Sequence, residues 1–294
     1  MKSRSIPFPY STSGFTLIEV LVAAAVSMLL VGLLLSAANA ISTNYSRTQA
    51  AITRQGDSSI ALDQIVQDLE GVVIPNFPGA EGLRIEKITS VPQVTDAIWL
   101  AMVSTATDRD NSFGNPNPVS GTGSAPSFTG ARRAISYRVV FQNPINPARD
   151  SGKIYALYRS VASARHTFNH LGPDKPNILD QYWKNIPPSP NPTPPPAEDP
   201  AAFLAGNVVN FQVRFEYLDS SGKSAWTKPG DAIRISRDGT YVNNQPIAGG
   251  FRRAEVSVTT LSPEGAQRVQ DGALTLEEAL ARYGTTTTRQ TSRL

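Results

Sequence analysis

The sequence of 294 residues contains no cysteine and only two histidines. The absence of cysteine excludes disulfides, thiolate nucleophiles and every zinc site that needs a cysteine ligand. Long basic clusters are missing too. The longest runs of Lys or Arg are the pairs Arg132-Arg133 and Arg252-Arg253, and aromatic residues do not alternate with basic ones there. The net charge of +3 at pH 7 therefore does not indicate nucleic-acid binding, and no nucleic-acid partner is expected. We expect each arginine pair at the start of a strand.

Catalytic motifs and metal sites are also lacking. No nucleophile elbow, phosphate-binding loop or dinucleotide fingerprint occurs. His166 and His170 have helical i, i+4 spacing, but Thr167 stands where a zincin has glutamate, so we interpret them as loop histidines. The segment DRDNSFGN at 108–115 resembles a calcium loop, yet its twelfth position is Val119 rather than glutamate, which favours a solvated turn. We predict no metal, no cofactor and no enzymatic activity.

The long apolar run lies close to the N-terminus. Residues 15–38 contain a single charged side chain, Glu19. As a helix this segment is about 36 Å long, enough to cross a hydrocarbon core of about 30 Å. The preceding residues 1–14 carry Lys2 and Arg4 and no acidic residue, so the positive-inside rule keeps them in the cytoplasm. The sequence predicts a transmembrane helix over 15–38 with the C-terminal part exported.

Glu19 is unusual in such a segment. A carboxylate costs roughly 2.5 to 3.5 kcal/mol at the centre of a membrane helix, so it normally marks a pairing partner. A secretory signal peptide cleaved near Ser36-Ala37-Ala38 leaves Glu19 unexplained. Cleavage between Gly14 and Phe15 would create an amino group four residues before Glu19, within one helical turn, and the amine could also face Glu19 of a neighbouring subunit.

The segment GFTLIEVL, residues 14–21, resembles the class III signal of type IV pilins and type II secretion pseudopilins. The resemblance implies that a prepilin peptidase cleaves after Gly14 and N-methylates Phe15, and that Glu19 serves assembly of the helix into a filament. It also implies a single-pass protein of the bacterial inner membrane, with a cytoplasmic leader and a periplasmic C-terminal domain. The implied partners are that peptidase, inner-membrane lipid before assembly, the major subunit and other minor pilins or pseudopilins.

The motif does not distinguish a pilus from a secretion system or a DNA-uptake apparatus. A second hypothesis comes from another class of protein: a type II membrane-anchored periplasmic domain, binding or enzymatic, that never assembles. Glu19 separates the two hypotheses, because only assembly or pairing with the N-terminal amine gives it a partner.

Beyond the membrane the sequence predicts an α+β fold. Apolar residues from Ile41 to Leu69 fall largely on one stripe, which predicts an amphipathic continuation of the helix over 39–70, with a kink or new cap possible at Gly56. Residues 71–294 are expected to form a β-rich globular domain, one antiparallel sheet packed on the helix as in pilins. Its expected strands span 83–88, 97–103, 134–141, 154–159, 208–217, 232–236 and 254–261. The clean alternation in 208–217 predicts a central strand.

Two polar segments interrupt this domain. Residues 104–130 and 172–200 lack the apolar content to fold alone, and the second contains the proline run IPPSPNPTPPPAEDP, which we interpret as an exposed spacer rather than a ligand for an aromatic groove. Residues 274–283 predict a short helix with Thr275 as its cap and Glu278 at capping-box spacing. The order of segments such as AISYRV and LAGNVVNF resembles the J-type pseudopilin and the W-type minor pilin; the proline insert and final helix depart from that pattern.

Overall fold

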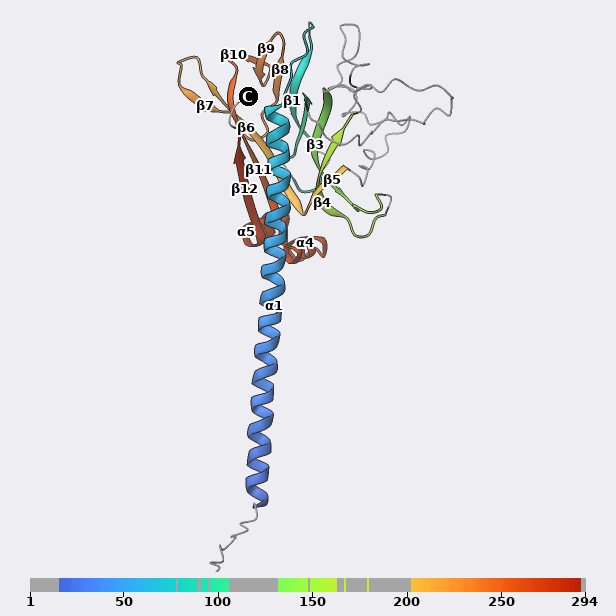
Figure 1. Ribbon diagram of the computed structural model, residues 1–294, viewed down its shortest axis with the longest axis vertical. Coiled ribbons are helices and arrows are strands. Elements are labelled where there is room, and N and C mark those ends of the chain that lie inside the picture. Colours follow the sequence, from blue (N-terminus) through green and yellow to red (C-terminus); the bar gives the residue numbers. More distant parts are fainter. Residues whose placement is uncertain are drawn as a thin grey trace, which may run out of the picture. The chain divides into compact units, whose positions relative to one another are not determined.

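The computed structural model describes residues 16–77, 79–88, 91–94, 96–105, 132–147, 149–162, 167, 179 and 202–291. The chain divides into two units, residues 1–51 (the N-terminal unit) and residues 52–294 (the globular unit). Helix α1 (Leu17–Glu70) contributes to both (Figure 1). The polar segments, the two histidines and the DRDNSFGN sequence are not among the described residues, apart from Ser104, Thr105 and Leu179 within the segments.

Helix α1 is continuous over 54 residues, close to the predicted 15–70. It passes through Gly56 without a break, because an isolated glycine costs only about 1 kcal/mol in a helix. It ends before Gly71, whose N–H donates to the carbonyl of Gln67 at 3.1 Å. A Cβ at residue 71 would lie 2.7 Å from Oγ of Ser104, so the close approach of this turn to a strand requires glycine.

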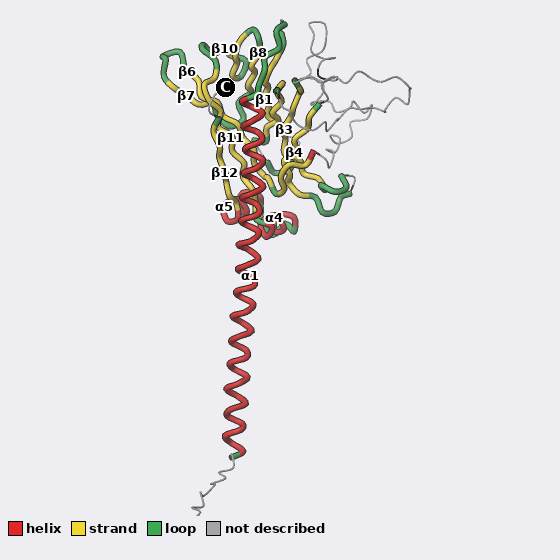
Figure 2. The backbone as a smooth tube through the Cα atoms, in the orientation of Figure 1, coloured by secondary structure: helices red, strands yellow, loops and turns green. Residues whose placement is uncertain are grey.

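The described residues form two antiparallel sheets, not the one predicted (Figure 2). The eight-stranded sheet has the order β10 (Gln245–Ile247), β9 (Gly239–Val242), β8 (Ile233–Ser236), β1 (Glu81–Lys87), β2 (Ile98–Ser104), β3 (Arg133–Gln142), β4 (Ile154–Val161), β5 (Phe203–Gly206). The four-stranded sheet has the order β12 (Gly284–Gln290), β11 (Phe251–Leu261), β6 (Val208–Leu218), β7 (Ser224–Trp226). The chain passes from the first sheet to the second after β5 and back again for β8 to β10.

All seven predicted strands are present, as β1, β2, β3, β4, β6, β8 and β11. The arginine pairs lie at strand starts as expected, since β3 begins at Arg133 and β11 at Phe251. The sequence reading missed β5, β7, β9, β10, β12 and the helix α4 (Pro263–Gln270). The hairpin of β9 and β10 turns on Asn243 and Asn244, both at positive φ, which asparagine tolerates better than most residues.

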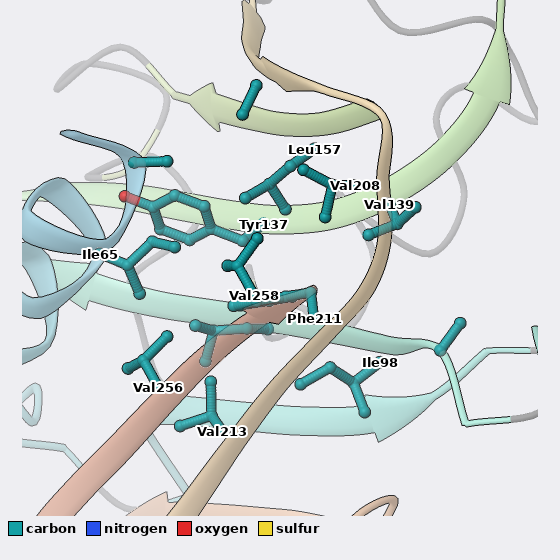
Figure 3. Packing of buried hydrophobic residues seen from close by; sticks show 14 of the residues in the cluster. Ile65, Ile98, Tyr137, Val139, Leu157, Val208, Phe211, Val213, Val256 and Val258 are labelled. Carbon is teal, nitrogen blue, oxygen red and sulfur yellow. The ribbon is translucent and has the colours of Figure 1, made fainter. Parts of the chain in front are cut away.

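One apolar core joins α1 to both sheets within the globular unit (Figure 3). Ile65 of α1, Tyr137 of β3 and Phe211 of β6 are fully buried or nearly so. Burying side chains of this size stabilises the fold by about 1.5 to 3 kcal/mol each. Strand β6 lies between β11 and β7, which confirms the prediction that 208–217 is an interior strand.

The buried face of α1 differs in detail from the predicted stripe. Ala61, Leu62, Ile65 and Leu69 are buried, whereas Ile60, which we placed on the stripe, is 68% exposed. The helical period puts residue 61 with residues 65 and 69 and turns residue 60 outward.

The predicted C-terminal helix is confirmed as α5 (Leu276–Tyr283). The hydroxyl of Thr275 accepts from the N–H of Glu278, and the Glu278 carboxylate accepts from the N–H of Thr275 at 2.9 Å. This reciprocal pair is the capping box that the sequence predicted.

Candidate assembly site on helix α1

The apolar part of α1, Leu17–Tyr45, is the first component of the candidate site. Its 29 residues are long and apolar enough to cross a membrane, and none of its most apolar stretch is buried by the rest of the chain. Leu17 and Ile18 are 80% and 70% exposed. Because each such side chain gains about 1.5 to 3 kcal/mol when it leaves water, the segment requires an apolar covering, either lipid or other helices.

Two hydroxyl groups within this segment donate to the helix's own backbone. Ser27 Oγ donates to the carbonyl of Ala23 at 2.8 Å, and Thr43 Oγ1 donates to the carbonyl of Asn39 at 2.8 Å. Such internal bonds allow hydroxyl side chains to lie in an apolar environment. Unlike these neutral hydroxyl groups, the carboxylate of Glu19 is charged, and it is the single charged side chain of the segment.

Glu19 lies in the first turn of α1 and is exposed. Its N–H donates to the carbonyl of Thr16 at 3.0 Å, and Thr16 Oγ1 donates to its carboxylate at 3.5 Å. A negative charge in the first turn interacts favourably with the helix dipole. Among the described residues no cation lies within ion-pair distance of Glu19. Gly14 and Phe15, the other predicted site residues, lie outside the described residues, so their cleavage and pairing with Glu19 stay predictions.

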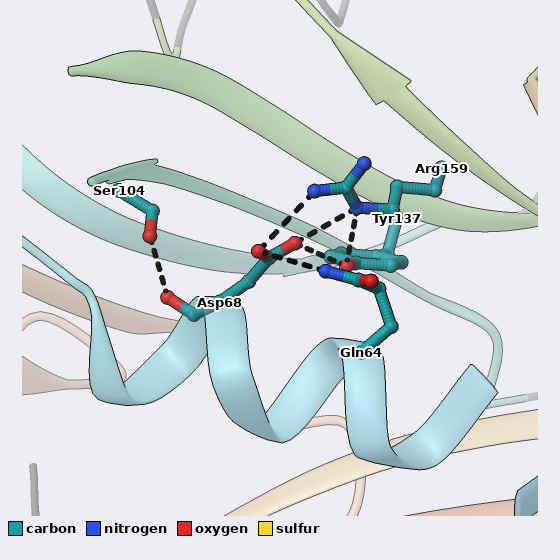
Figure 4. Close-up of polar contacts among 5 residues, drawn as sticks. All are labelled: Gln64, Asp68, Ser104, Tyr137 and Arg159. Carbon is teal, nitrogen blue, oxygen red and sulfur yellow. Dashed lines mark hydrogen bonds and ion pairs between the residues drawn. The ribbon is translucent and has the colours of Figure 1, made fainter. Parts of the chain in front are cut away.

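A buried polar cluster fixes the other end of α1 to the eight-stranded sheet (Figure 4). Arg159 Nε and Nη2 donate to the two carboxylate oxygens of Asp68 at 2.8 and 3.2 Å. The hydroxyl of Tyr137 donates to the same carboxylate and accepts from Arg159 Nε at 2.9 Å. Gln64 Nε2 donates to Asp68 Oδ1 at 3.3 Å, and Ser104 Oγ donates to the Asp68 carbonyl at 2.9 Å. The cluster thus connects α1 with β2, β3 and β4.

The surroundings of Tyr137 and Arg159 in this cluster shift the pKa values of both side chains upward. Burial raises the pKa of the Tyr137 hydroxyl well above its usual range, and the neighbouring Asp68 raises it further, so Tyr137 remains a neutral donor. Burial acts against the charge of Arg159, but Tyr137 and Asp68 outweigh it and the pKa of Arg159 is raised. Both pKa values are moved away from neutral pH, so neither Tyr137 nor Arg159 is suited to proton transfer and the arrangement fits a structural role.

A second, exposed contact fixes α1 to the four-stranded sheet. Arg289 of β12 donates to Asp63 at 3.2 Å and to Ser59 at 2.9 Å. The side chains of Arg289 and Asp63 are 48% and 65% exposed. An exposed pair of this kind contributes at most about 1 kcal/mol.

Asp68 was not among the predicted site residues, although the sequence contains a signal for it. Asp68 is a charged residue among the buried positions of α1, between Ile65 and Leu69. A carboxylate at a core position needs a cation or several donors. Its partners on β3 and β4 are far away in sequence, so the sequence does not identify them.

Within the described part of the chain no group of three or more His, Asp or Glu side chains is placed to hold a metal.

No protein-family model matches the chain, and no curated protein matches it. Among solved structures, a type IV-like pilin from Thermus thermophilus is similar over 80% of this chain and 93% of that chain. The sequence identity is 12% and the TM-score is 0.34. This likeness is too distant to assign a family, so the function has to be argued from the chain's own residues. Those residues define an α+β protein whose N-terminal helix can anchor it in a membrane.

Proposed function

We propose that the protein is a minor pilin or pseudopilin, a structural subunit of a type IV pilus or a type II secretion pseudopilus. The observation that carries the proposal is the segment GFTLIEVL, residues 14–21, together with the fact that Glu19 is the one charge of the exposed apolar stretch Leu17–Tyr45. Intramembrane carboxylates are rare unless they pair. In a filament of such helices, Glu19 of one subunit meets the amine of Phe15 of another.

In this proposal residues 1–14 are a cytoplasmic leader that a prepilin peptidase removes after Gly14 before it methylates Phe15. The protein is inserted in the bacterial inner membrane through residues 15–38, with the globular unit in the periplasm. It then joins the major subunit and other minor subunits through α1. Its role is structural rather than enzymatic.

Processing is tested by mass spectrometry of the membrane-extracted protein. We expect an N-terminus at Phe15 carrying one added methyl group. Gly14→Val should retain the leader, because a branched side chain crowds the peptidase where wild type has none, while Thr12→Val, two residues away in the same leader, should be cleaved normally. An N-terminus at or beyond Ser36 would indicate a secretory signal instead, and normal cleavage of the Gly14 variant would contradict the proposed site.

Assembly is tested by Glu19→Leu. Insertion and cleavage should persist, since the change removes a charge that costs up to roughly 3 kcal/mol in the bilayer. Crosslinking to filament partners should fall by about two orders of magnitude or more, because one amine loses its carboxylate and breaking a buried pair costs about 3 to 5 kcal/mol. Glu277→Leu, the same change at an exposed site of α5, should assemble normally. Wild-type crosslinking with leucine at 19 would mean that Glu19 serves something other than subunit docking, whereas absence of crosslinks from the wild-type chain itself would favour a membrane-anchored domain that never assembles.

A further inference from the structure

A row of large side chains crosses the outer face of the eight-stranded sheet. Trp99 of β2 lies opposite Arg138 of β3, Arg138 lies opposite Tyr158 of β4, and Tyr158 lies opposite Phe203 of β5. Directly opposed residues of antiparallel strands project from the same face. Tyr137, next to Arg138 in sequence, points toward α1, so these four residues, the aromatic row, point away from α1.

The N–H of the Trp99 indole has no hydrogen-bond partner among the described residues. Trp99 is 3% exposed, and its Nε1 is fully buried. Buried polar groups nearly always have a partner, and the indole nitrogen can only donate. Trp99 therefore requires a hydrogen-bond acceptor from a part of the chain that lies over the outer face.

The connection between β4 and β5 contacts this face at two described residues. Leu179 is fully buried in a cluster with Trp99 and with small side chains of β2 and β3. Ala202 is buried in a cluster with Tyr158. Neither cluster contains a residue of α1, α4, α5 or the four-stranded sheet. The chain is therefore held beside one end of the aromatic row at residue 179 and near its other end at residue 202.

We infer that the aromatic row binds the proline run of the same chain, residues 186–196, in the polyproline II conformation. The run, IPPSPNPTPPP, lies between Leu179 and Ala202 in sequence, so both of its ends are held at the face that it would cover. This role differs from the exposed spacer that the sequence alone suggested.

The chemistry of a proline run matches the row. Proline has a carbonyl but no N–H, so the run offers acceptors to the Trp99 indole and leaves few donors unpaired when it is buried. Proline-rich segments dock on aromatic side chains in many recognition domains. The polyproline II helix is already extended in the free chain, so it loses little entropy on docking.

The spacing of the row matches as well. Trp99 and Tyr158 are two strands apart, which is about 9.6 Å at the usual strand spacing of about 4.8 Å. Polyproline II repeats every three residues, which is about 9.3 Å. Prolines three positions apart can therefore pack one on each ring. The run contains two such pairs, Pro187 with Pro190 and Pro192 with Pro195.

The positions of the two held residues also give the direction of the run. Leu179 contacts the cluster of Trp99, and Ala202 contacts the cluster of Tyr158. The earlier proline of a pair therefore packs on Trp99 and the later one on Tyr158. The other polar segment, residues 104–130, contains Pro116, Pro118 and Pro126, and no two of these are three positions apart.

NMR of the full chain in detergent micelles, with 15N in its tryptophan indoles, tests this inference. Trp99→Phe identifies the Trp99 signal among the three tryptophans. The Trp99 N–H should exchange slowly in wild type and about tenfold faster or more when residues 186–196 are replaced by glycine and serine at equal length. The Trp226 signal, from the four-stranded sheet, should stay unchanged and so report an intact fold. Free peptide IPPSPNPTPPP, added in excess to the replaced chain, should restore slow exchange.

Two sets of substitutions within the run test the spacing. Changing Pro187, Pro190, Pro192 and Pro195 together to alanine removes both pairs and should speed exchange of the Trp99 N–H by about tenfold or more. Changing Pro188, Pro194 and Pro196 to alanine leaves both pairs in place, and exchange should stay close to that of wild type.

Slow exchange of the Trp99 N–H in the glycine and serine chain would overturn the inference, and so would fast exchange in wild type. Equal exchange rates in the two sets of proline variants would contradict the pairing of prolines with Trp99 and Tyr158. Protection that appears in wild type only at high protein concentration would identify the proline run of a second copy as the occupant and overturn our choice. These measurements do not involve cleavage or assembly, so the proposed function stands or falls separately.

Discussion

Replacing Asp68 by leucine removes the acceptor of a buried arginine and of a buried tyrosine at once. Asp68 is 1% exposed and Arg159 is 8% exposed, so water cannot replace the lost carboxylate. Removing one partner of a buried ion pair costs about 3 to 5 kcal/mol. The free energy of unfolding of a domain is only about 5 to 15 kcal/mol, so this single change is expected to remove a large part of it.

The same structure predicts how stability returns when the partners are removed together. Asp68→Leu with Arg159→Met leaves no buried charge in this cluster, but the Tyr137 hydroxyl then lacks its carboxylate acceptor, which costs about 1 to 3 kcal/mol. Adding Tyr137→Phe removes that group. The triple variant should therefore be close to wild type in stability, since replacing a buried ionic cluster by apolar residues of similar volume is often neutral.

The assay is urea unfolding of the full chain in detergent micelles, followed by tryptophan fluorescence and by circular dichroism. Asp63→Leu is the matched control, because it breaks an ion pair on the same helix that is exposed, and should cost at most about 1 kcal/mol. The reasoning would be refuted if Asp68→Leu cost no more than Asp63→Leu, or if the triple variant were as unstable as Asp68→Leu alone.

Three further substitutions test other parts of the globular unit by the same unfolding assay. Gly265→Ala should lower the free energy of unfolding by about 1 to 3 kcal/mol, because the added Cβ would lie 2.6 Å from Cβ of Tyr283. Gly56→Ala adds a Cβ that meets nothing within 4 Å and should stabilise α1 by about 0.5 to 1 kcal/mol. Effects of equal sign for the two variants would contradict the packing of α4 on α5. Arg253 lowers the pKa of Glu216, so the stability that Glu216 contributes is present above its unfolded pKa of about 4.3 and is lost as the pH falls through the folded value. Glu216→Gln should therefore reduce the loss of stability below about pH 4.3, and an unchanged pH profile would count against the ion pair.

Local patterns account for what could be predicted from the sequence. The length of α1 follows from an apolar run that merges into helical periodicity, with no proline between residues 10 and 74. The capping box of α5 depends only on Thr275 and Glu278, which are three positions apart, so it can be recognised from the local sequence alone. Strand β6 alternates apolar and polar side chains from Val209 to Tyr217, which identifies both its period and its buried face.

Long-range geometry accounts for what could not be predicted. Asp68 and Arg159 are 91 positions apart, and nothing in the sequence pairs them. Strand β12 reads as four threonines between glycine and arginine, without the apolar alternation that identifies a half-buried strand, because its exposed edge and faces impose no such pattern. The division into two sheets depends on where the chain crosses after β5, which local propensity does not specify.

The unequal burial of the two contacts on α1 has a mechanical consequence. Beside the apolar core that joins α1 to both sheets, tension along α1 is passed to the eight-stranded sheet by the buried bonds of Asp68 and to the four-stranded sheet by the exposed pair of Asp63 and Arg289. Salt screens the exposed pair, since the Debye length at physiological ionic strength is about 8 Å, but hardly affects the buried one. At high ionic strength a stretched molecule should therefore loosen first along β12, while β3 and β4 continue to carry the force.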